Sequence, residues 1–373
     1  MYRNLTLHFL TPISYSNLNR DDTGTPKRLV EGGVLRAMHS SQAIKRGIRV
    51  AYEDSSLDVS VRSGNIAEDI RDAALEIQPY LDRRKALNKA KKIINTLTKK
   101  EKEKDKNKDK DIENEVEAER SIWMSEEEIQ VAAQIVTEQI TASEDFIQNG
   151  RTGSLAIAAF GRMFAAKPEK GTEAALSVSP AITTHAASIG TDYFTTIDDI
   201  RERNKFAGSD ARTGATYLGI SQFTSGIFYR TVTIDRMQLQ TSWTAFNTAK
   251  AEKNLRELIT AIIYGQPRGK EHSTAPYTQP ALVLAEEQRY RCAYSFETPV
   301  QADNIHGGFL EPSIRALSMQ FHAARSFDPD NFGNTFALAG TYPNIKDTFG
   351  IEPVSKNALI NTVTAWILGD KNE

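Results

Sequence analysis

Cationic side chains gather at the start of this chain. The first 49 residues hold eight Lys or Arg against three acidic residues, although the whole chain of 373 residues carries a formal charge of −2. A local cationic surface suits an anion such as phosphate, whereas the near-neutral total argues against a general nucleic-acid coat driven by net charge. The candidate cations are Arg20, Lys27, Lys45, Arg46 and Arg49.

A helix is expected directly after two serines in this segment. Ser40 or Ser41 is a good N-cap, so the first turn would present free backbone N–H groups and the positive end of the helix dipole to a phosphate. Lys45 and Arg49 are four residues apart and share one face of this helix. The same spacing is typical of an ordinary amphipathic helix with a solvated basic face, which the spacing alone favours.

Binding of single-stranded nucleic acid requires cations along the phosphates and flat or apolar side chains that stack on the bases. Ser40 and Gln42 add neutral hydrogen-bonding groups beside the cations. Stacking contributes about 1–3 kcal/mol per base and accepts any base, which suits a protein that carries changing sequences. The candidate apolar contacts are Met163, Tyr193, Phe194, Ile197 and Leu218.

Catalytic and metal-ligand patterns are weak in this sequence. Its six histidines are scattered, and it has neither a Walker loop nor a nucleophile elbow. Asp21-Asp22 and Asp198-Asp199 are paired acids, but adjacent loop aspartates are more often turn formers than magnesium ligands. The lone Cys292 excludes an intramolecular disulfide. We therefore expect no catalytic residue, no metal and no cofactor.

The length of the chain predicts two domains, or one domain with a large insertion. Alternating side chains predict a half-buried first strand over residues 5–9 that ends at Pro12, and apolar spacing predicts a helix over 255–262 that stops at Gly265. This order is compatible with an α+β, ferredoxin-like or RRM-like sheet covered by helices on one face. Further strands are expected at residues 176–179, 223–234 and 281–285.

Residues 60–172 read as a helical insertion between two parts of the sheet domain, 1–59 and 173–373. Within it, Ser125-Glu126-Glu127-Glu128 has the pattern of a capping box that starts a helix. Residues 83–111 hold 13 basic and 5 acidic residues. This cationic segment is interpreted as a solvated surface connection, with a sequence-blind contact to DNA as the alternative.

Residues 190–220 form a long segment with four glycines that interrupts a strand-rich region. Loops of this length are usually functional or disordered. It carries apolar side chains at both ends, which either pack on a partner or tuck under their own loop.

Targeting and membrane signals are not evident in the sequence. No stretch approaches the roughly 18 uninterrupted apolar residues of a membrane helix, and the first residues lack the apolar region of a signal peptide. We expect a cytoplasmic protein without a membrane partner.

Several short motifs together resemble the CasC family, the repeated backbone subunit of the type I-E CRISPR complex Cascade. Each motif is weak by itself, and together they are specific. They extend from the N-terminus to about residue 235, with a weaker echo at 307–314. The motifs are the segment 17–49, Gly161-Arg162-Met163, Ala181-Ile182-Thr183-Thr184-His185, Tyr193-Phe194-Thr195 and Gln222-Phe223-Thr224-Ser225-Gly226-Ile227-Phe228-Tyr229-Arg230.

This resemblance implies a hand-shaped, non-catalytic subunit with an RRM-like palm, a helical finger (60–172) and a long thumb loop (190–220). Copies of the subunit would form a helical filament along the guide RNA (crRNA). Each thumb would force out one base and leave the others free to pair with target DNA in antiviral defence. Further partners would be the large, small, capping and crRNA-processing subunits.

The same resemblance implies which residues bind RNA. In the thumb, Tyr193 stands where the family often has tryptophan, an exchange that preserves stacking. Residues 201–216 receive no assignment, and the match is thin after residue 240. The implied palm contacts are Arg20, Lys27, Ser40, Gln42, Lys45, Arg46 and Arg49, with Met163 pressing on the bases. The implied thumb contacts are Tyr193, Phe194, Thr195 and Ile197, with Leu218 on the returning side.

Two other functions stay open at this point. One is a CRISPR backbone endoribonuclease that cuts bound target RNA with a loop aspartate, Asp21 or Asp22. The other is a free-standing housekeeping RNA-binding protein. Cleavage of complementary RNA at regular spacing would favour the first, and co-purification with a short RNA that has repeat-derived ends would exclude the second.

Overall fold

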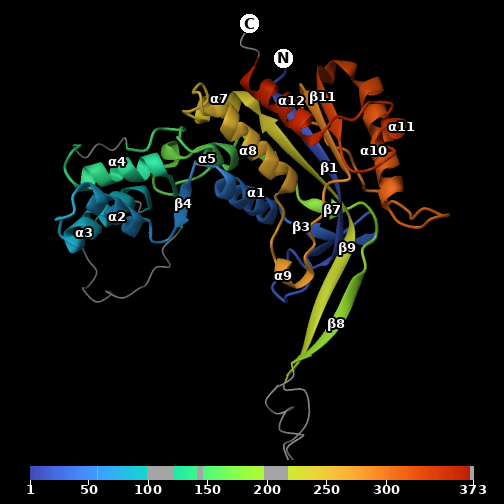
Figure 1. Ribbon diagram of the computed structural model, residues 1–373, viewed down its shortest axis with the longest axis horizontal. Helices are drawn as coiled ribbons and strands as arrows, with labels where there is room; N and C mark the ends of the chain where they lie inside the picture. The colour runs from blue at the N-terminus through green and yellow to red at the C-terminus, as the bar shows by residue number, and fades with distance from the viewer. Residues whose placement is uncertain (57, 99–120, 141–145, 197–216, 370–373) are drawn as a thin grey trace, which may run out of the picture.

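A large antiparallel sheet forms the centre of the chain in the computed structural model, which describes residues 1–56, 58–98, 121–140, 146–196 and 217–369. Its strand order is β11-β10-β1-β9-β7-β3-β2, and β6 and β8 also pair with β9 (Figure 1). Strands β4 and β5 form a separate two-stranded sheet. The expected class of mixed helices and antiparallel strands is therefore confirmed.

The bounds of the elements are as follows. The strands are β1 (Asn4–Ser16), β2 (Arg28–Glu31), β3 (Val34–His39), β4 (Ser60–Ser63), β5 (Ile122–Ser125), β6 (Leu176–Val178), β7 (Ala181–Thr183), β8 (Ile189–Thr196), β9 (Tyr217–Asp235), β10 (Leu282–Gln288) and β11 (Phe332–Ala339). The helices are α1 (Ser41–Ser55), α2 (Ile66–Ile77), α3 (Arg83–Thr98), α4 (Glu126–Val136), α5 (Leu155–Phe160), α7 (Arg236–Ser242), α8 (Ala251–Tyr264), α9 (Glu271–Thr274), α10 (Leu310–Phe327), α11 (Ile345–Phe349) and α12 (Lys356–Leu368).

Helices cover both faces of the large sheet, so the expectation of helices on one face is wrong. Alternation along β1 and β10 explains the two layers, because successive side chains point to opposite faces. Phe9 and Val283 pack in a core with α1, α5, α8 and α12. Leu10 and Leu284 pack in a second core with α10 and α11.

Residues 4–10 of strand β1 are buried on both faces rather than half-buried. Thr6 and His8 have no exposed surface, although they lie on the face opposite Leu5 and Leu7. The strand also continues through Pro12 to its end, four residues beyond the expected stop. Strand β10 pairs only with residues 4–10, so Pro12 lies where β1 has a free edge, a place at which sheets tolerate proline.

Residues 61–164 contribute a hydrophobic core of their own, built mainly from α2, α3 and α4. Figure 1 shows these three helices together on one side of the large sheet. The predicted capping box is confirmed: Ser125 Oγ accepts from Glu128 N at 3.2 Å, and Glu128 Oε2 accepts from Ser125 N at 2.9 Å. For residues 83–98 the expected solvated connection is wrong, because they form α3, whose Ala86, Ala90 and Leu97 are buried in this core. The cationic run at 99–111 lies outside the described residues.

The predicted helix and strands in the second half of the chain are confirmed with longer bounds. Helix α8 ends at Tyr264 with Gly265 as its C-cap. Strand β9 starts at Tyr217 instead of 223. The long loop expected over 190–220 is wrong at both ends, because β8 pairs with β9 from Ile189–Thr224 to Thr196–Tyr217.

A buried polar cluster joins the sheet to α10. The Glu286 carboxylate accepts hydrogen bonds from Tyr294 Oη at 2.9 Å and Arg325 Nη2 at 2.8 Å. His8 Nε2 lies 3.0 Å from Glu286 Oε1. Burial by itself raises the pKa of Glu286, but the bond and charge of His8 and the charge of Arg325 lower it to about 2. Glu286 therefore stays ionised inside the protein.

Glu286 is expected to make the protein lose stability in acid. The pKa of Glu286 in the folded protein lies below the ordinary value of 4.5. Its contribution of about 3 kcal/mol to the free energy of unfolding is therefore present above pH 4.5 and is lost as the pH falls toward about 2. Glu286→Gln is expected to cost about 3–5 kcal/mol near neutral pH, because Arg325 loses its partner. Urea unfolding of both proteins against pH measures this. The difference between them should shrink in acid, and a constant difference would contradict the assignment. Glu311→Gln is the control, because the Glu311 carboxylate on α10 is partly exposed and its partner Arg315 is exposed.

None of the described helices is long and apolar enough to span a bilayer.

Candidate nucleic-acid interface

The N-terminus of α1 is built as expected from the sequence. Ser40 is the N-cap, and its hydroxyl accepts from Ala43 N at 3.4 Å. No acidic side chain lies in the first turn, so the positive end of the helix dipole is not neutralised by the helix itself. Gln42 is exposed in this turn. The start of α1 therefore has the features of an anion site.

The loop that carries Arg20 is tied to the start of α1. Ser40 N donates to Asn19 Oδ1 at 2.8 Å, and Lys27 N donates to Asn19 O at 2.9 Å. Arg20 pairs with Pro26 in an isolated bridge. Asn19 thus fixes both the loop and the helix start, and sets Arg20 and Lys27 beside α1.

The cations of this region differ in their surroundings. Arg20 and Arg46 are exposed, and Lys27 and Lys45 are half-buried. Arg49 is already engaged: its Nη1 lies 2.5 Å from Glu53 Oε2, and its guanidinium lies 5.6 Å from the ring centroid of Trp123. Its role in RNA binding stays a prediction, and it would require exchange of this ion pair.

Asp21 is a turn former. Its carboxylate accepts four hydrogen bonds, from the backbone N–H and the hydroxyl of both Thr23 and Thr25. The bonds from the hydroxyls of Thr25 and Thr23 lower the pKa of Asp21 to about 2. Asp22 is exposed beside it, whereas Asp198 and Asp199 lie outside the described residues. Within the described ranges, no three acidic, histidine or cysteine side chains cluster as metal ligands would.

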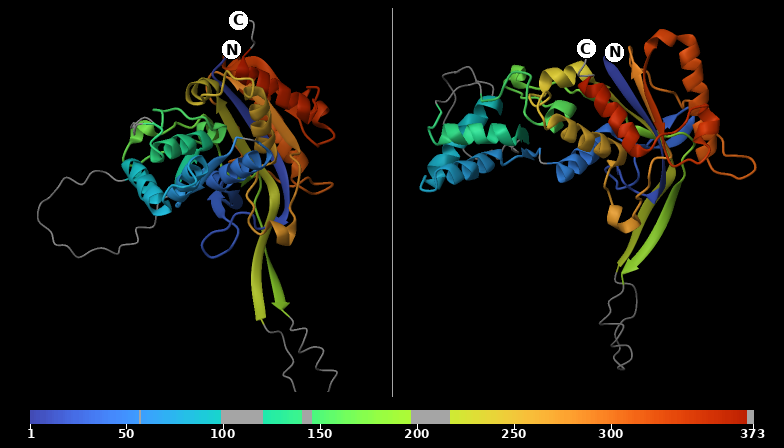
Figure 2. Two further views of the ribbon diagram at one scale, coloured as in Figure 1. Left: turned by 60° about the vertical axis from the view of Figure 1, so that its left-hand side comes forward. Right: turned by 45° about the horizontal axis from the view of Figure 1, so that its top comes forward.

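Strand β8 and the start of β9 form a two-stranded ribbon, the β8–β9 ribbon, which covers residues 189–196 and 217–224. Both views of Figure 2 show it standing out from the sheet. Tyr193 pairs with Ile220, and Thr195 with Leu218, so these four side chains share one face. Phe194 lies on the other face with Tyr217, and their ring centroids are 6.2 Å apart. Both faces of the ribbon therefore carry apolar side chains.

The apolar side chains of the ribbon do not tuck under it. Tyr193 is 66% exposed, Leu218 63% and Phe194 43%. Phe194 lies over its partner Gly219, where an added Cβ would come within 2.2 Å of the ring. Ile197 lies outside the described residues. Exposed apolar groups gathered in this way are typical of a surface that binds a partner.

Met163 projects from a turn at the edge of the finger core. It is 84% exposed and follows Gly161, whose φ of 76° is in the left-handed region. The neighbouring Arg162 is buried, with both terminal nitrogens 2.5 Å from the Glu128 carboxylate. Because Glu128 also completes the capping box of α4, this ion pair fixes Met163 relative to the finger.

Arg162→Met is expected to lower the free energy of unfolding by about 3–5 kcal/mol, because it leaves Glu128 charged and buried without its partner. Urea unfolding measures this change. The double variant Arg162→Met with Glu128→Gln should recover most of the loss, since glutamine also serves in a capping box and carries no charge. If the double variant is as unstable as the single one, the loss arises from packing and not from the charge.

The segment after α8 joins these parts into one region. Gly47 of α1 packs so closely that an added Cβ would lie 2.2 Å from Gln266 O. Gly269 N donates to Leu18 O at 3.0 Å, and Lys270 Nζ donates to Ser221 Oγ at 3.0 Å at the base of the ribbon. The α1 start, the Arg20 loop and the ribbon base are therefore linked, whereas Met163 belongs to the finger.

The structure adds three residues to the candidates predicted from the sequence. Tyr217 and Ile220 are exposed on the ribbon beside the predicted thumb contacts. Lys270 stands at the ribbon base, 5.7 Å from the ring centroid of Phe223. Extension of the strand predicted at 223–234 back to residue 217 would have found the first two.

Comparisons with known proteins agree with this fold. One solved chain, from a structure described as "CRISPR RNA-guided surveillance complex, pre-nicking", is 24% identical, with a TM-score of 0.77 over 98% of this chain and 100% of that chain. Another, from a "CRISPR RNA-guided surveillance complex", is 22% identical, with a TM-score of 0.70 over 97% of this chain and 99% of that chain. At these identities, the similarity shows the fold alone.

Sequence comparison shows the family. No curated protein matches the chain. The profile of the CT1975-like protein family matches residues 5–360, which is most of the sequence. This chain is therefore a member of the CT1975-like protein family.

Proposed function

We propose that this chain is the guide-RNA-binding backbone subunit of a type I-E CRISPR surveillance complex, with no catalytic act of its own. The proposal is supported by the family match over residues 5–360 and by the likeness of the whole fold to chains from RNA-guided surveillance complexes. It is also supported by the two chemical features of the interface, the cationic helix start and the apolar ribbon.

The ribbon is the observation that carries the proposal. Large apolar side chains stand exposed on both of its faces, with Tyr193 and Leu218 on one and Phe194 on the other. Flat apolar groups bind bases of any type by stacking. A ribbon with two such faces suits insertion between successive nucleotides, because it stacks on the base before it and on the base after it.

The cations have the complementary role of holding phosphates. Arg20, Lys27, Lys45 and Arg46 lie on or beside the start of α1, where backbone N–H groups and the helix dipole also favour negative charge. Neither feature reads base identity. Sequence recognition would then fall to pairing between the guide RNA and target DNA, with the protein reading the backbone.

The partners of this subunit follow from the same proposal. Residues 1–59 and 173–373 would form an RRM-like palm, 60–172 the finger and 190–220 the thumb. Copies that contact head to tail without closing a ring make a filament, and one RNA along it ties the copies together. The large, small, capping and crRNA-processing subunits would complete a cytoplasmic complex in antiviral defence.

A backbone endoribonuclease is the second candidate, with Asp22 as its loop aspartate. Asp21 is poorly placed for this chemistry, because four hydrogen bonds already occupy its carboxylate. Asp22 is exposed and carries no such bonds among the described residues.

Incubation of the assembled complex with magnesium and complementary RNA separates the two functions. We expect the RNA to stay intact with the wild type and with Asp22→Ala. Cleavage at regular spacing that Asp22→Ala abolishes would instead establish the enzyme. The same complex should contain a bound short RNA with repeat-derived ends, and its absence would contradict the backbone assignment.

A further inference from the structure

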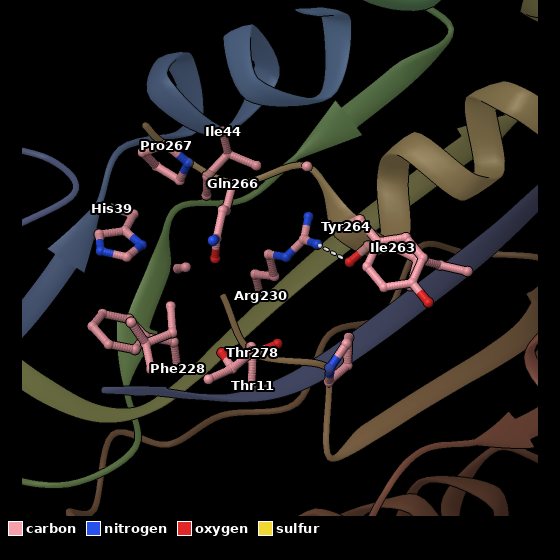
Figure 3. Close-up of a pocket in the computed structure, with 14 residues that line it drawn as sticks. Thr11, His39, Ile44, Phe228, Arg230, Ile263, Tyr264, Gln266, Pro267 and Thr278 are labelled. Carbon is pink, nitrogen blue, oxygen red and sulfur yellow. Dashed lines mark hydrogen bonds between the residues drawn. The ribbon is translucent and has the colours of Figure 1, made fainter. Parts of the chain in front are cut away.

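A small cavity lies between the sheet and the place where α1 begins and α8 ends. Its volume is about 30 Å³, which is room for about two water molecules. Figure 3 shows Arg230, Gln266 and Thr278 around it, with His39 and Ile44 on the side of α1. The lining thus combines apolar walls with several polar groups.

Arg230 is the unusual residue of this cavity. The side chain is buried, and its guanidinium lies 4.2 Å from the ring centroid of Phe9. Nη2 donates to Ile262 O at 2.7 Å and contacts Ile263 O at 3.4 Å, which are free carbonyls of the last turn of α8. Nη1 is buried and has no hydrogen-bond partner. Nη2 of the guanidinium therefore caps α8, whereas Nη1 faces no hydrogen-bond acceptor of the described chain.

The charge of Arg230 is also unmatched. Of the described carboxylates, none forms an ion pair with it. Burial lowers the pKa of Arg230 to about 10, so the side chain is still protonated at neutral pH. Buried charges are normally paired, because an isolated ion in a protein interior is costly. The helix dipole of α8 offsets this cost only in part.

Other polar groups of the cavity are also suited to an anion. Thr278 Oγ1 is buried and has no hydrogen-bond partner, and a hydroxyl can donate to an anion. Burial and then the charge of Arg230 lower the pKa of His39 to about 4, so the imidazole is neutral at pH 7 and offers one N–H donor. Gln266 adds a side-chain amide to the lining.

Water would satisfy the hydrogen bonds of these groups, but it would leave the guanidinium charge unmatched. A monatomic anion does both and is only slightly larger than water. We propose that this cavity is a binding site for a small inorganic anion of the size of chloride, held by Arg230 Nη1 and Thr278 Oγ1. The site stabilises the junction of α1, α8 and the sheet, and it does not depend on the proposed RNA-binding function.

Crystals of the full chain grown with bromide in place of chloride test this site directly. We expect an anomalous bromide peak within hydrogen-bond distance of both Arg230 Nη1 and Thr278 Oγ1. A water without anomalous signal at that point, or an empty cavity, would overturn the proposal.

Thermal unfolding provides the second test. At constant ionic strength, chloride replaces gluconate in steps. Each tenfold rise in chloride concentration above the dissociation constant of the chloride complex should raise the melting temperature of the wild type by about 2 °C. Thr278→Val keeps the guanidinium and removes one donor, so it should raise that constant about 2- to 12-fold.

Three further variants make this result decisive. Thr241→Val removes an exposed hydroxyl on α7 that donates to Met237 O of its own helix, away from the cavity lining, and should keep the wild-type response. Arg230→Lys retains a charge and should keep part of the response, whereas Arg230→Met should lose all of it. An equal response to chloride in the wild type and in Thr278→Val would contradict the site, even if the Arg230 variants fail to fold.

Discussion

Replacement of Tyr193 and Phe194 together by alanine is expected to lower the affinity of the chain for single-stranded RNA by about 5- to 150-fold for each lost stack. The two rings lie on opposite faces of the ribbon, so the double variant removes a stacking surface from both sides at once. Their exposure means that the fold loses little packing, and we expect the free energy of unfolding to change by no more than about 0.5 kcal/mol.

Ribonuclease protection of the guide RNA in the assembled complex measures this effect. The double variant should leave RNA near the ribbon open to cleavage at regular intervals that the wild type protects. Tyr80→Ala is the matched control, because this tyrosine is 99% exposed and belongs to the connection between α2 and α3, two helices that stand apart from the ribbon (Figure 1). Wild-type protection in the double variant would contradict the assignment of the ribbon.

Lys45→Ala combined with Arg46→Ala is expected to weaken RNA binding and to reduce its dependence on salt. Each phosphate contact to a single strand contributes about −0.7 to the slope of log affinity against log salt, so the slope should become shallower by about 1.4. The two side chains are solvent-accessible on the first turns of α1, and the described structure gives neither an ion pair. The fold should therefore tolerate both changes.

Titration of RNA into the purified chain at several salt concentrations measures the slope. Lys346→Ala is the control, because it removes an exposed lysine on α11, which covers the opposite face of the sheet. Loss of affinity with an unchanged slope would remove Lys45 and Arg46 from contact with phosphates. A slope that changes equally in Lys346→Ala would show that only the net charge matters.

Local signals predicted three helices of this chain, α1, α4 and α8. Ser40 and Ser125 cap α1 and α4 as their side chains indicate, and Gly265 ends α8. A capping hydroxyl acts within three residues of its own position, so the sequence itself contains the cause. The position of α1 and its basic face therefore follow from the residues of the helix and its cap alone.

Long-range pairing was the part that the sequence did not predict. Glycines and aspartates made 190–220 resemble a loop, but β8 is stabilised by its partner β9 across the ribbon. The alternation of β1 predicted that Thr6 and His8 face solvent. Instead, His8 is buried and contacts Glu286 and Tyr229, which are distant from it in the sequence. Strand preference depends on such tertiary neighbours more than on the residue itself.

The candidate site shows the same division. The predicted palm residues lie on or beside α1. The four-residue spacing of Arg49 and Glu53 in this helix is a local signal for their ion pair, whereas only the fold brings Arg49 near Trp123. The sequence also did not show which of the predicted thumb contacts share a face, because the faces follow from the register of β8 with β9. Arg230, read from the sequence as one residue of an alternating strand, caps α8.

Photocrosslinking of the assembled complex with thiouridine-containing guide RNA tests the central claim most directly. We predict crosslinks to peptides from the start of α1 and from both strands of the β8–β9 ribbon, repeated at a regular interval along the RNA. Crosslinks confined to other surfaces, such as α10 and α11 on the opposite face of the sheet, would show that this cationic helix and this apolar ribbon do not hold the RNA.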